Sequence, residues 1–267
     1  MMRTTMALTA TALLIGACAA PDGDEGEVAS SATKPETRAS EWVSIFDGES
    51  LDGWTPKIAG YPLGENFGDT FRVEDGMIKA RFDQYGDDFA QRYGLLVYET
   101  PYEHYRLRLE YRFTGEQTPG GEDWAELNSG VIYHIQPLET IPQDAGFPVA
   151  LEAQFLAEGA HAPTTGNMCS LETSVVVKNE RPDDHCILSD IPARPKDHWV
   201  RFELEAAPGG IFRHYIDGEL AFEFSEAIFD VPQDWADGMS VDRGFFALQS
   251  ESHPVDFRNI ELMVLEN

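Results

Sequence analysis

The sequence predicts an all-β domain, a jelly-roll sandwich of two antiparallel sheets. From Glu41 onward, short runs of alternating apolar and polar residues are broken by turn residues. Helical periodicity is nearly absent, apart from a turn or two over residues 225–235. No internal repeat is visible, which argues against a propeller. Many short strands with one apolar side bury those sides best when two sheets pack face to face.

The clearest strand covers residues 104–113. Its odd-numbered positions, from Tyr105 to Phe113, are aromatic or leucine, and its even-numbered positions are polar. This period of two is typical of a half-buried strand. Asp75-Gly76 and Asp217-Gly218 stand between such runs and favour tight primed hairpin turns. The other expected strands are 77–82, 94–98, 130–136, 149–156, 174–178, 198–205, 211–216, 219–224, 244–250 and 255–265.

The first residues have the features of an exported, lipid-modified protein. Arg3 is followed by an apolar run over 6–15 and then by two small residues before Cys18. The run is shorter than the roughly 18–20 residues that span a bilayer. We therefore expect a signal peptide over 1–17 and a lipid on Cys18. The alternative is an ordinary secretory cleavage, with Cys18 incidental.

Residues 18–40 are predicted to be a disordered linker. They are rich in Asp, Glu, Ala, Ser, Thr and Pro and contain no aromatic side chain, so they cannot bury enough surface to fold. The folded domain then covers 41–267. Lipid and linker together predict an exported lipoprotein, anchored to a membrane on its periplasmic or outer-membrane face. Ala19 favours the outer membrane where the host has one.

Charge and cysteine content narrow the partners. The chain carries 47 acidic and 19 basic side chains, a formal charge of −28, which would repel phosphate backbones. We therefore expect no nucleic-acid partner. Besides Cys18, only Cys169 and Cys186 remain, an even pair that we expect to form a disulfide outside the reducing cytosol. Two thiols without a metal-ligand spacing make a poor zinc site.

Two strands carry candidate site residues. Within 149–156, Glu152 and Gln154 share the polar face, about 7 Å apart by strand rise. Such a pair suits a hydroxylated ligand, although a solvated outer face is the alternative. His134 follows Asn128-Ser129-Gly130 on another strand and could act as a base near neutral pH. The alternative is a surface histidine or a hydrogen-bonded one.

The end of the chain carries further candidates. Leu248-Gln249-Ser250-Glu251 ends one strand, and Arg258 lies between Phe257 and Asn259 on the last. The planar five-donor fork of Arg258 could hold a carboxylate or a sugar oxygen. It could equally pin the C-terminal strand to a neighbouring turn.

Several of these motifs occur in the order found in a known family. The sequence resembles the DUF1080 family, also called the 3-keto-disaccharide hydrolase domain, over about residues 42–265. The resemblance implies a concanavalin A-like jelly roll, export, and action on glycosides already oxidised at C3. Its landmarks are the run Ile-Phe-Asp-Gly-Glu-Ser-Leu-Asp-Gly-Trp over 45–54, Asn128-Ser129-Gly130, Glu152-Ala153-Gln154, Trp199 leading to Tyr215-Ile216-Asp217-Gly218, residues 247–251, and Phe257-Arg258-Asn259-Ile260.

The resemblance also implies a mechanism. Ordinary glycosidases use two carboxylates at a set separation, and Glu152-Ala153-Gln154 lacks the second. A C3 ketone acidifies the C2 proton, so the C1 substituent can leave by elimination and water can add back. On this interpretation Glu152 or His134 removes the C2 proton. The expected substrate-binding residues are Asn128, Gln154, Gln249, Glu251 and Arg258.

Other expectations concern cofactors, partners and departures from the family pattern. No cofactor is required, although a divalent metal could act as the electrophile with His134, Glu152 and Glu251 as ligands. An oxidoreductase must install the ketone, so we expect one as a functional partner. His134 stands where the family commonly has Arg, and Ala157 where it has Asp. The insertion over 159–194 could be a rim or a lid.

A second function remains open. A non-catalytic carbohydrate-binding lipoprotein could use the same concave groove, because fold alone does not decide function. Exposed aromatic rings without a buried ionisable group would favour binding. A pocket around Glu152 with a perturbed carboxyl would favour catalysis.

Overall fold

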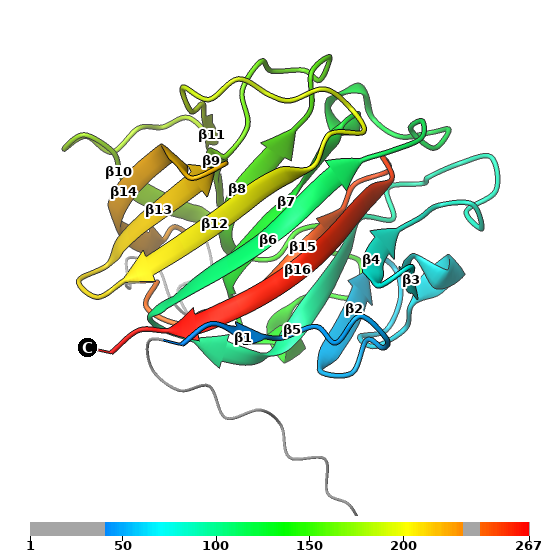
Figure 1. The fold of residues 1–267 in the computed structure, drawn as a ribbon, viewed down its shortest axis with the longest axis horizontal. Helices are drawn as coiled ribbons and strands as arrows, with labels where there is room; N and C mark the ends of the chain where they lie inside the picture. The colour runs from blue at the N-terminus through cyan, green and yellow to red at the C-terminus, as the bar shows by residue number, and fades with distance from the viewer. Residues whose placement is uncertain (1–40, 232–240, 267) are drawn as a thin grey trace, which may run out of the picture. The chain divides into compact units, whose positions relative to one another are not determined.

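The computed structural model describes residues 41–231 and 241–266. The predicted signal peptide over 1–17, Cys18 and the predicted linker over 18–40 lie outside these residues. The described part consists of two stacked antiparallel sheets (Figure 1), which confirms the predicted all-β sandwich. Three short 3-10 helices connect strands: η1 (Phe67–Asp69), η2 (Asp123–Ala125) and η3 (Leu138–Thr140).

The first sheet has nine strands. Its order is β10-β14-β13-β12-β6-β16-β4-β3, with β1 pairing with β16. In Figure 1, β12, β6 and β16 run across the front of the molecule. The strands are β1 (Val43–Ser44), β3 (Phe71–Glu74), β4 (Met77–Ala80), β6 (Tyr105–Phe113), β10 (Thr173–Val176), β12 (Val200–Ala207), β13 (Ile211–Ile216), β14 (Glu219–Phe229) and β16 (Val255–Val264).

The second sheet has seven strands and carries the site described below. Its order is β11-β9-β8-β7-β15-β5-β2. It lies behind the first sheet in Figure 1. The strands are β2 (Trp54–Ile58), β5 (Gly94–Tyr102), β7 (Asn128–Ile135), β8 (Ala150–Leu156), β9 (Asn167–Leu171), β11 (Cys186–Ile187) and β15 (Gly244–Ser250).

Aromatic side chains join the two sheets in the core. The odd-numbered residues of β6 are buried and its even-numbered residues are half-buried, as the alternation predicts. Tyr111 of β6 stacks on Phe155 of β8, with ring centroids 4.0 Å apart. Phe202 of β12 packs its edge against the same ring at 4.8 Å. Phe155 therefore links three strands from the two sheets.

Both predicted hairpin turns are present. Asp75 and Gly76, with φ of 55° and 73°, connect β3 to β4, and Asp217 and Gly218, with φ of 53° and 86°, connect β13 to β14. Positive φ at both central positions is the requirement of a type I′ turn, whose twist matches that of the strands. These dipeptides therefore fix the register of the two hairpins.

The predicted helical turn over 225–235 is wrong where it can be compared with the structure. Strand β14 continues to Phe229 and pairs with β10, and residues 232–235 lie outside the described residues. Glu226 has a φ of 49° and lies at a register shift between the two strands. This irregularity interrupts the period of two, so the sequence no longer resembles a strand there.

A disulfide and a covering loop shape the outer side of the seven-stranded sheet. Cys169 of β9 and Cys186 of β11, the expected pair, are joined in a disulfide across directly paired positions. The loop 136–149 covers a second apolar cluster on the outer face of β5, β7 and β15.

Within residues 41–231 and 241–266, no helix is both long and apolar enough to cross a membrane.

We predict that Phe155→Ala lowers the free energy of unfolding by about 3–5 kcal/mol, because it leaves a cavity between the sheets. Urea unfolding followed by tryptophan fluorescence measures this loss. Leu220→Ala is the control, since Leu220 is 50% exposed, and should change stability by less than about 0.5 kcal/mol. Equal effects of the two substitutions would contradict the role given to Phe155.

Candidate active site

A cavity of about 800 Å³ opens on the outer face of the seven-stranded sheet. Strand β8 supplies the floor of the cavity. Its residues Leu151, Ala153 and Phe155 point into the core between the sheets. The alternation of the strand then directs Glu152 and Gln154 to the opposite face, where both line the cavity. The sequence prediction that these two side chains share one face is confirmed.

A glycine brings side chains from neighbouring strands together on this floor. Gly130 of β7 pairs with Gln154 of β8, and on its other side it adjoins Gln249 of β15, one residue beyond the Val131–Leu248 pair. A Cβ at Gly130 would lie 2.9 Å from Glu152 Oε1 and 3.1 Å from Gln249 Oε1. Glu152 and Gln249 therefore occupy the space that a side chain at position 130 would need.

Glu152 and Glu251 form a pair of buried carboxyls linked by one glutamine. Both line the cavity, and their exposed fractions are 5% and 2%. Gln249 Nε2 donates to Glu251 Oε1 at 2.9 Å, and the Gln249 side chain also hydrogen bonds to Glu152. The structure thus brings together three of the predicted site residues.

Burial dominates the ionisation of this pair. It raises the pKa of Glu152 to about 8, although the hydrogen bond from Gln249 acts in the opposite direction. Burial, together with the charge of Glu152, raises the pKa of Glu251 well above its ordinary value. Near neutral pH the pair is therefore mainly protonated.

Unpartnered oxygen atoms face the same region. Asn128 Nδ2 donates to the Trp124 carbonyl oxygen at 3.1 Å, which leaves Asn128 Oδ1 buried without a hydrogen bond. Gln249 Oε1 and Glu251 Oε2 are also buried and unpartnered within the described part of the chain. Buried polar atoms normally find partners. The two amide oxygens are suited to accept hydrogen bonds from a ligand, and the protonated Glu251 carboxyl can donate one through Oε2.

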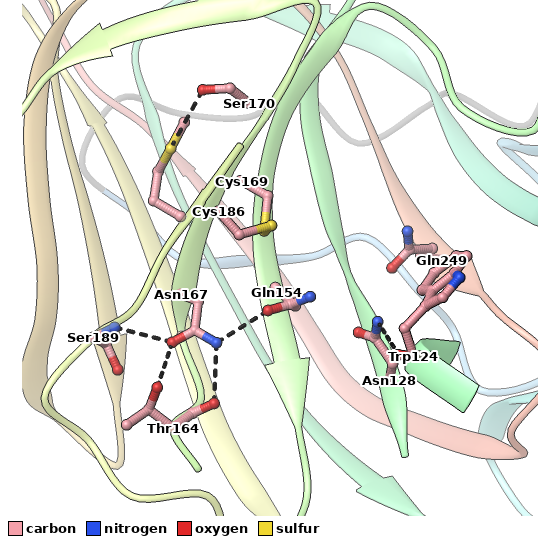
Figure 2. Close-up of a disulfide and its surroundings, with 12 residues drawn as sticks. Trp124, Asn128, Gln154, Thr164, Asn167, Cys169, Ser170, Cys186, Ser189 and Gln249 are labelled. Carbon is pink, nitrogen blue, oxygen red and sulfur yellow. Dashed lines mark hydrogen bonds between the residues drawn. A yellow bond between two sulfur atoms is a disulfide. The ribbon is translucent and has the colours of Figure 1, made fainter. Parts of the chain in front are cut away.

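Gln154 is oriented by residues that the sequence analysis missed. Asn167 Nδ2 donates to Gln154 Oε1 at 3.0 Å and to the Thr164 carbonyl oxygen at 3.0 Å. Asn167 Oδ1 accepts from Thr164 Oγ1 and from the Ser189 backbone N–H. Figure 2 shows the amide nitrogen of Gln154 turned away from Asn167, toward the side where Asn128 and Gln249 lie. Strand β9 is short and its sequence does not alternate, so no local pattern marks Asn167 as a site residue. Its position beside Gln154 follows only from the pairing of β9 with β8.

Aromatic rings form one wall of the cavity. Trp124 of η2 is 40% exposed and stacks on Tyr93, with centroids 5.5 Å apart. Phe147 packs against both rings. Burial raises the pKa of Tyr93 to about 12, and the nearby charge of Glu251 contributes to this shift. A flat, partly exposed ring beside polar groups suits the mixed surface of a sugar.

His134 does not belong to this site, so its predicted role as the base is wrong. It has a φ of 50° and lies beside a register shift between β7 and β15, and this bulge turns its ring into the sandwich. There it packs edge-on against Phe212 of the other sheet at 5.1 Å, and its Nδ1 lies 3.0 Å from the Val241 carbonyl oxygen. Burial lowers the pKa of His134 to about 4. The alternative, a hydrogen-bonded structural histidine, fits the structure.

The predicted ligand role of Arg258 is also wrong. Its side chain lies on the outer face of the nine-stranded sheet, on the other side of the sandwich from the cavity. Arg258 Nε donates to Glu110 Oε2 at 2.6 Å, and its guanidinium lies 3.8 Å from the Trp199 ring centroid. Arg258 therefore has a structural role, but it pins the C-terminal strand to the neighbouring strand β6 and not to a turn.

The insertion over 159–194, expected to form a rim or a lid, forms part of the wall of the cavity. This position favours the rim. His161, His185 and Cys186 line it. The metal arrangement considered from the sequence is not present, because His134 lies in the core, away from Glu152 and Glu251. Throughout 41–231 and 241–266, no three His, Cys, Asp or Glu side chains are grouped so that they could hold a metal ion.

We predict that the stability of the protein decreases as the pH rises from about 7 to 8. This range lies above the one in which the unfolded chain protonates His134, His214 and His253, whose pKa values burial lowers from 6.5 to about 4. The folded state keeps Glu152 protonated up to a pKa of about 8, whereas the unfolded chain releases this proton near the ordinary value of 4.5. The unfolded state therefore binds fewer protons in this range, and each pH unit costs roughly 1.4 kcal/mol. Urea unfolding at a series of pH values measures the slope.

Glu152→Gln should reduce this slope, because a glutamine does not titrate. Glu219→Gln, which removes an exposed carboxyl from β14, is the matched control and should keep the slope of the unmodified protein. An unchanged slope in Glu152→Gln would show that Glu152 is not protonated in the folded state.

Structural comparison places the fold among several known proteins. A protein of Parabacteroides distasonis, provisionally named a glycosyl hydrolase, is 19% identical with a TM-score of 0.56, over 84% of this chain and 94% of that one. A Bacillus subtilis protein of unknown function with a galectin-like fold is 10% identical with a TM-score of 0.52, over 86% and 99%. The VIP36 exoplasmic/lumenal domain, in its Ca²⁺/Man3GlcNAc-bound form, is 8% identical with a TM-score of 0.50, over 87% and 92%. At these identities the likeness shows the fold alone.

The sequence itself identifies the family. No protein with a curated description matches the chain. The model of the 3-keto-alpha-glucoside-1,2-lyase-like domain matches residues 41–263, which include both carboxyls of the cavity and nearly the whole described structure. This match confirms the resemblance seen in the ordered motifs. The chain therefore belongs to the 3-keto-alpha-glucoside-1,2-lyase-like domain family.

Proposed function

We propose that this protein cleaves 3-keto-glycosides by removing the C2 proton, eliminating the C1 substituent and adding water to the product. The observation that carries the proposal is the pair of buried carboxyls, Glu152 and Glu251, on the floor of an open cavity. Membership of a family named for a 3-keto-glucoside lyase supports the substrate class. The oligosaccharide in the VIP36 structure supports a sugar as ligand for this fold.

Glu152 acts as the base. A carboxyl with a pKa of about 8 is a stronger base when ionised than an ordinary surface carboxylate. The C2 proton is acidified by the neighbouring C3 ketone, and its removal places negative charge on the ketone oxygen. The amide nitrogen of Gln154, held in place by Asn167, is a donor for that oxygen.

Glu251 acts as the acid. Its pKa is raised by burial and also by the charge of Glu152, so Glu251 stays protonated when Glu152 is ionised. The C2–H bond breaks with transfer of the proton to Glu152, a C1–C2 double bond forms, and the C1–O bond breaks as Glu251 protonates the departing oxygen. Water then adds, with its hydroxyl on C1, while Glu152 returns a proton to C2 and Glu251 recovers one from the water. The net reaction is hydrolysis.

The unpartnered amide oxygens and an exposed ring supply the remaining contacts with the sugar. Asn128 Oδ1 and Gln249 Oε1 can each accept a hydrogen bond from a sugar hydroxyl. Trp124 supplies an exposed ring against which the sugar can pack. The same contacts would serve a protein that only binds carbohydrate, and the buried carboxyl pair is what favours catalysis over binding alone.

We predict that the purified domain releases the leaving group from a 3-keto-glucoside but not from the unoxidised parent. The rate should rise with pH, with a midpoint near 8, because Glu152 must be ionised. Glu152→Gln should reduce kcat by about 10²–10⁴-fold, the usual contribution of a positioned base. Chromatography of the released alcohol measures all three quantities.

Glu219→Gln serves again as the control and should retain the activity of the unmodified protein. Unchanged turnover in Glu152→Gln would remove Glu152 as the base. Binding of both sugars without cleavage of either would instead establish the carbohydrate-binding alternative.

We also propose that the protein works outside the cytosol, anchored by lipid on Cys18, with a separate oxidoreductase that forms the ketone. The Cys169–Cys186 disulfide supports an oxidising compartment. Cys18→Ser should move the protein from the membrane fraction to the soluble fraction and abolish palmitate labelling, whereas Ser30→Ala should change neither. Membrane association that survives Cys18→Ser would contradict the lipid anchor.

A further inference from the structure

We infer that the leaving group of the natural substrate is apolar, and that it occupies the half of the cavity beyond Glu152, between the loop 136–149 and β9. This inference rests on the proposed function, because it assigns the two halves of one cavity to the two parts of one glycoside. It therefore names an alkyl or aryl glycoside, in place of a disaccharide, as the substrate class.

Glu152 lies between a mainly polar side and a mainly apolar side of the cavity. Following β8 toward its end, Gln154 is next on the same face, and Asn128 and Glu251 lie nearby. In the other direction the strand presents Ala150, which pairs with Leu171 of β9. The apolar side of the cavity is lined by Pro142, Ala145, Phe147, Pro148, Leu171 and Val231.

The polar groups on the apolar side are already satisfied by the protein. Gln136 Nε2 donates to Thr140 Oγ1 at 2.7 Å, and Gln136 Oε1 accepts from the Val149 backbone N–H at 2.6 Å. Thr140 Oγ1 donates to the Pro137 carbonyl oxygen. Glu172 and His185 also line this side, but both are exposed to solvent. Ser170, next to Leu171, donates from Oγ to Met168 Sδ at 3.8 Å. A second sugar would find few free partners here, whereas the carboxyl side has three unpartnered oxygens.

The apolar wall is held in place before any ligand binds. Lys57 Nζ donates to the carbonyl oxygens of Gln143 and Ala145 at 3.0 and 3.2 Å, which fastens the loop to β2. Phe147 is packed on Tyr93. The cavity, at about 800 Å³, has the size of pockets that hold drug-like ligands and exceeds what one sugar ring requires. A preformed apolar surface that is continuous with the carboxyl site favours an apolar group attached to the sugar.

The test compares methyl and hexyl 3-keto-glucosides of the same anomer, together with a 3-keto-disaccharide. The two alkyl leaving groups have similar acidity, so a difference in kcat/KM reports contact with the alkyl chain. We expect hexyl to exceed methyl by at least about tenfold, since each buried methylene contributes several-fold to binding. Leu171→Asn should reduce this hexyl-to-methyl ratio several-fold, whereas Leu220→Ala, on the exposed surface of β14, should leave it unchanged.

Calorimetric binding of unoxidised hexyl and methyl glucosides to the unmodified protein gives a readout that needs neither turnover nor a variant. Hexyl glucoside should bind at least about tenfold more tightly. Equal values for hexyl and methyl, or a preference for the disaccharide, would overturn the apolar leaving group while leaving the proposed function intact. Cleavage of none of the three ketones would overturn the proposed function, and the calorimetric comparison would still decide on the apolar half.

Discussion

The alternation of strand β8 is the constraint on which the site depends. Leu151, Ala153 and Phe155 are committed to the core between the sheets, where Phe155 stacks on Tyr111 of the opposite layer. A one-residue shift of this strand would reverse its faces and expose that core, so the register is strongly determined. The burial of apolar side chains between the sheets therefore also holds Glu152 on the outer face. The geometry of the candidate site therefore follows from the packing of the hydrophobic core.

The site itself lowers the stability that the core provides. Two carboxyls are buried beside each other, and each must remain protonated or meet the other's charge. Nothing in the sandwich requires an acidic residue at either position, because both side chains line the outer cavity and neither belongs to the core between the sheets. An arrangement that is unfavourable for folding and contributes nothing to packing is typical of a functional site.

The sequence was sufficient for the fold and for about half of the site. Period-two runs and the Asp-Gly turns locate most strands, and the face shared by Glu152 and Gln154 follows from strand geometry alone. The errors arise where the chain departs from regular pairing. The bulge at His134 turns that side chain inward, and a sequence pattern carries no sign of such a reversal. Asn167 was missed because its role depends on pairing between segments that no local pattern connects. For Arg258, the sequence did not reveal that the side chain lies on the outer face of the nine-stranded sheet, away from the cavity.

The protonated state of the carboxyl pair also affects which molecules can enter the cavity. The whole chain has a formal charge of −28, yet near neutral pH the floor of the cavity carries little charge, because both carboxyls there hold their protons. A neutral ligand can bind without displacing water from an ion. Among the described residues that line the cavity, none is Lys or Arg. A carboxylate or phosphate ester of similar shape would therefore meet no compensating cation there and would be repelled by the surrounding surface. The overall charge thus favours the approach of neutral molecules over that of anions, before any direct contact is made.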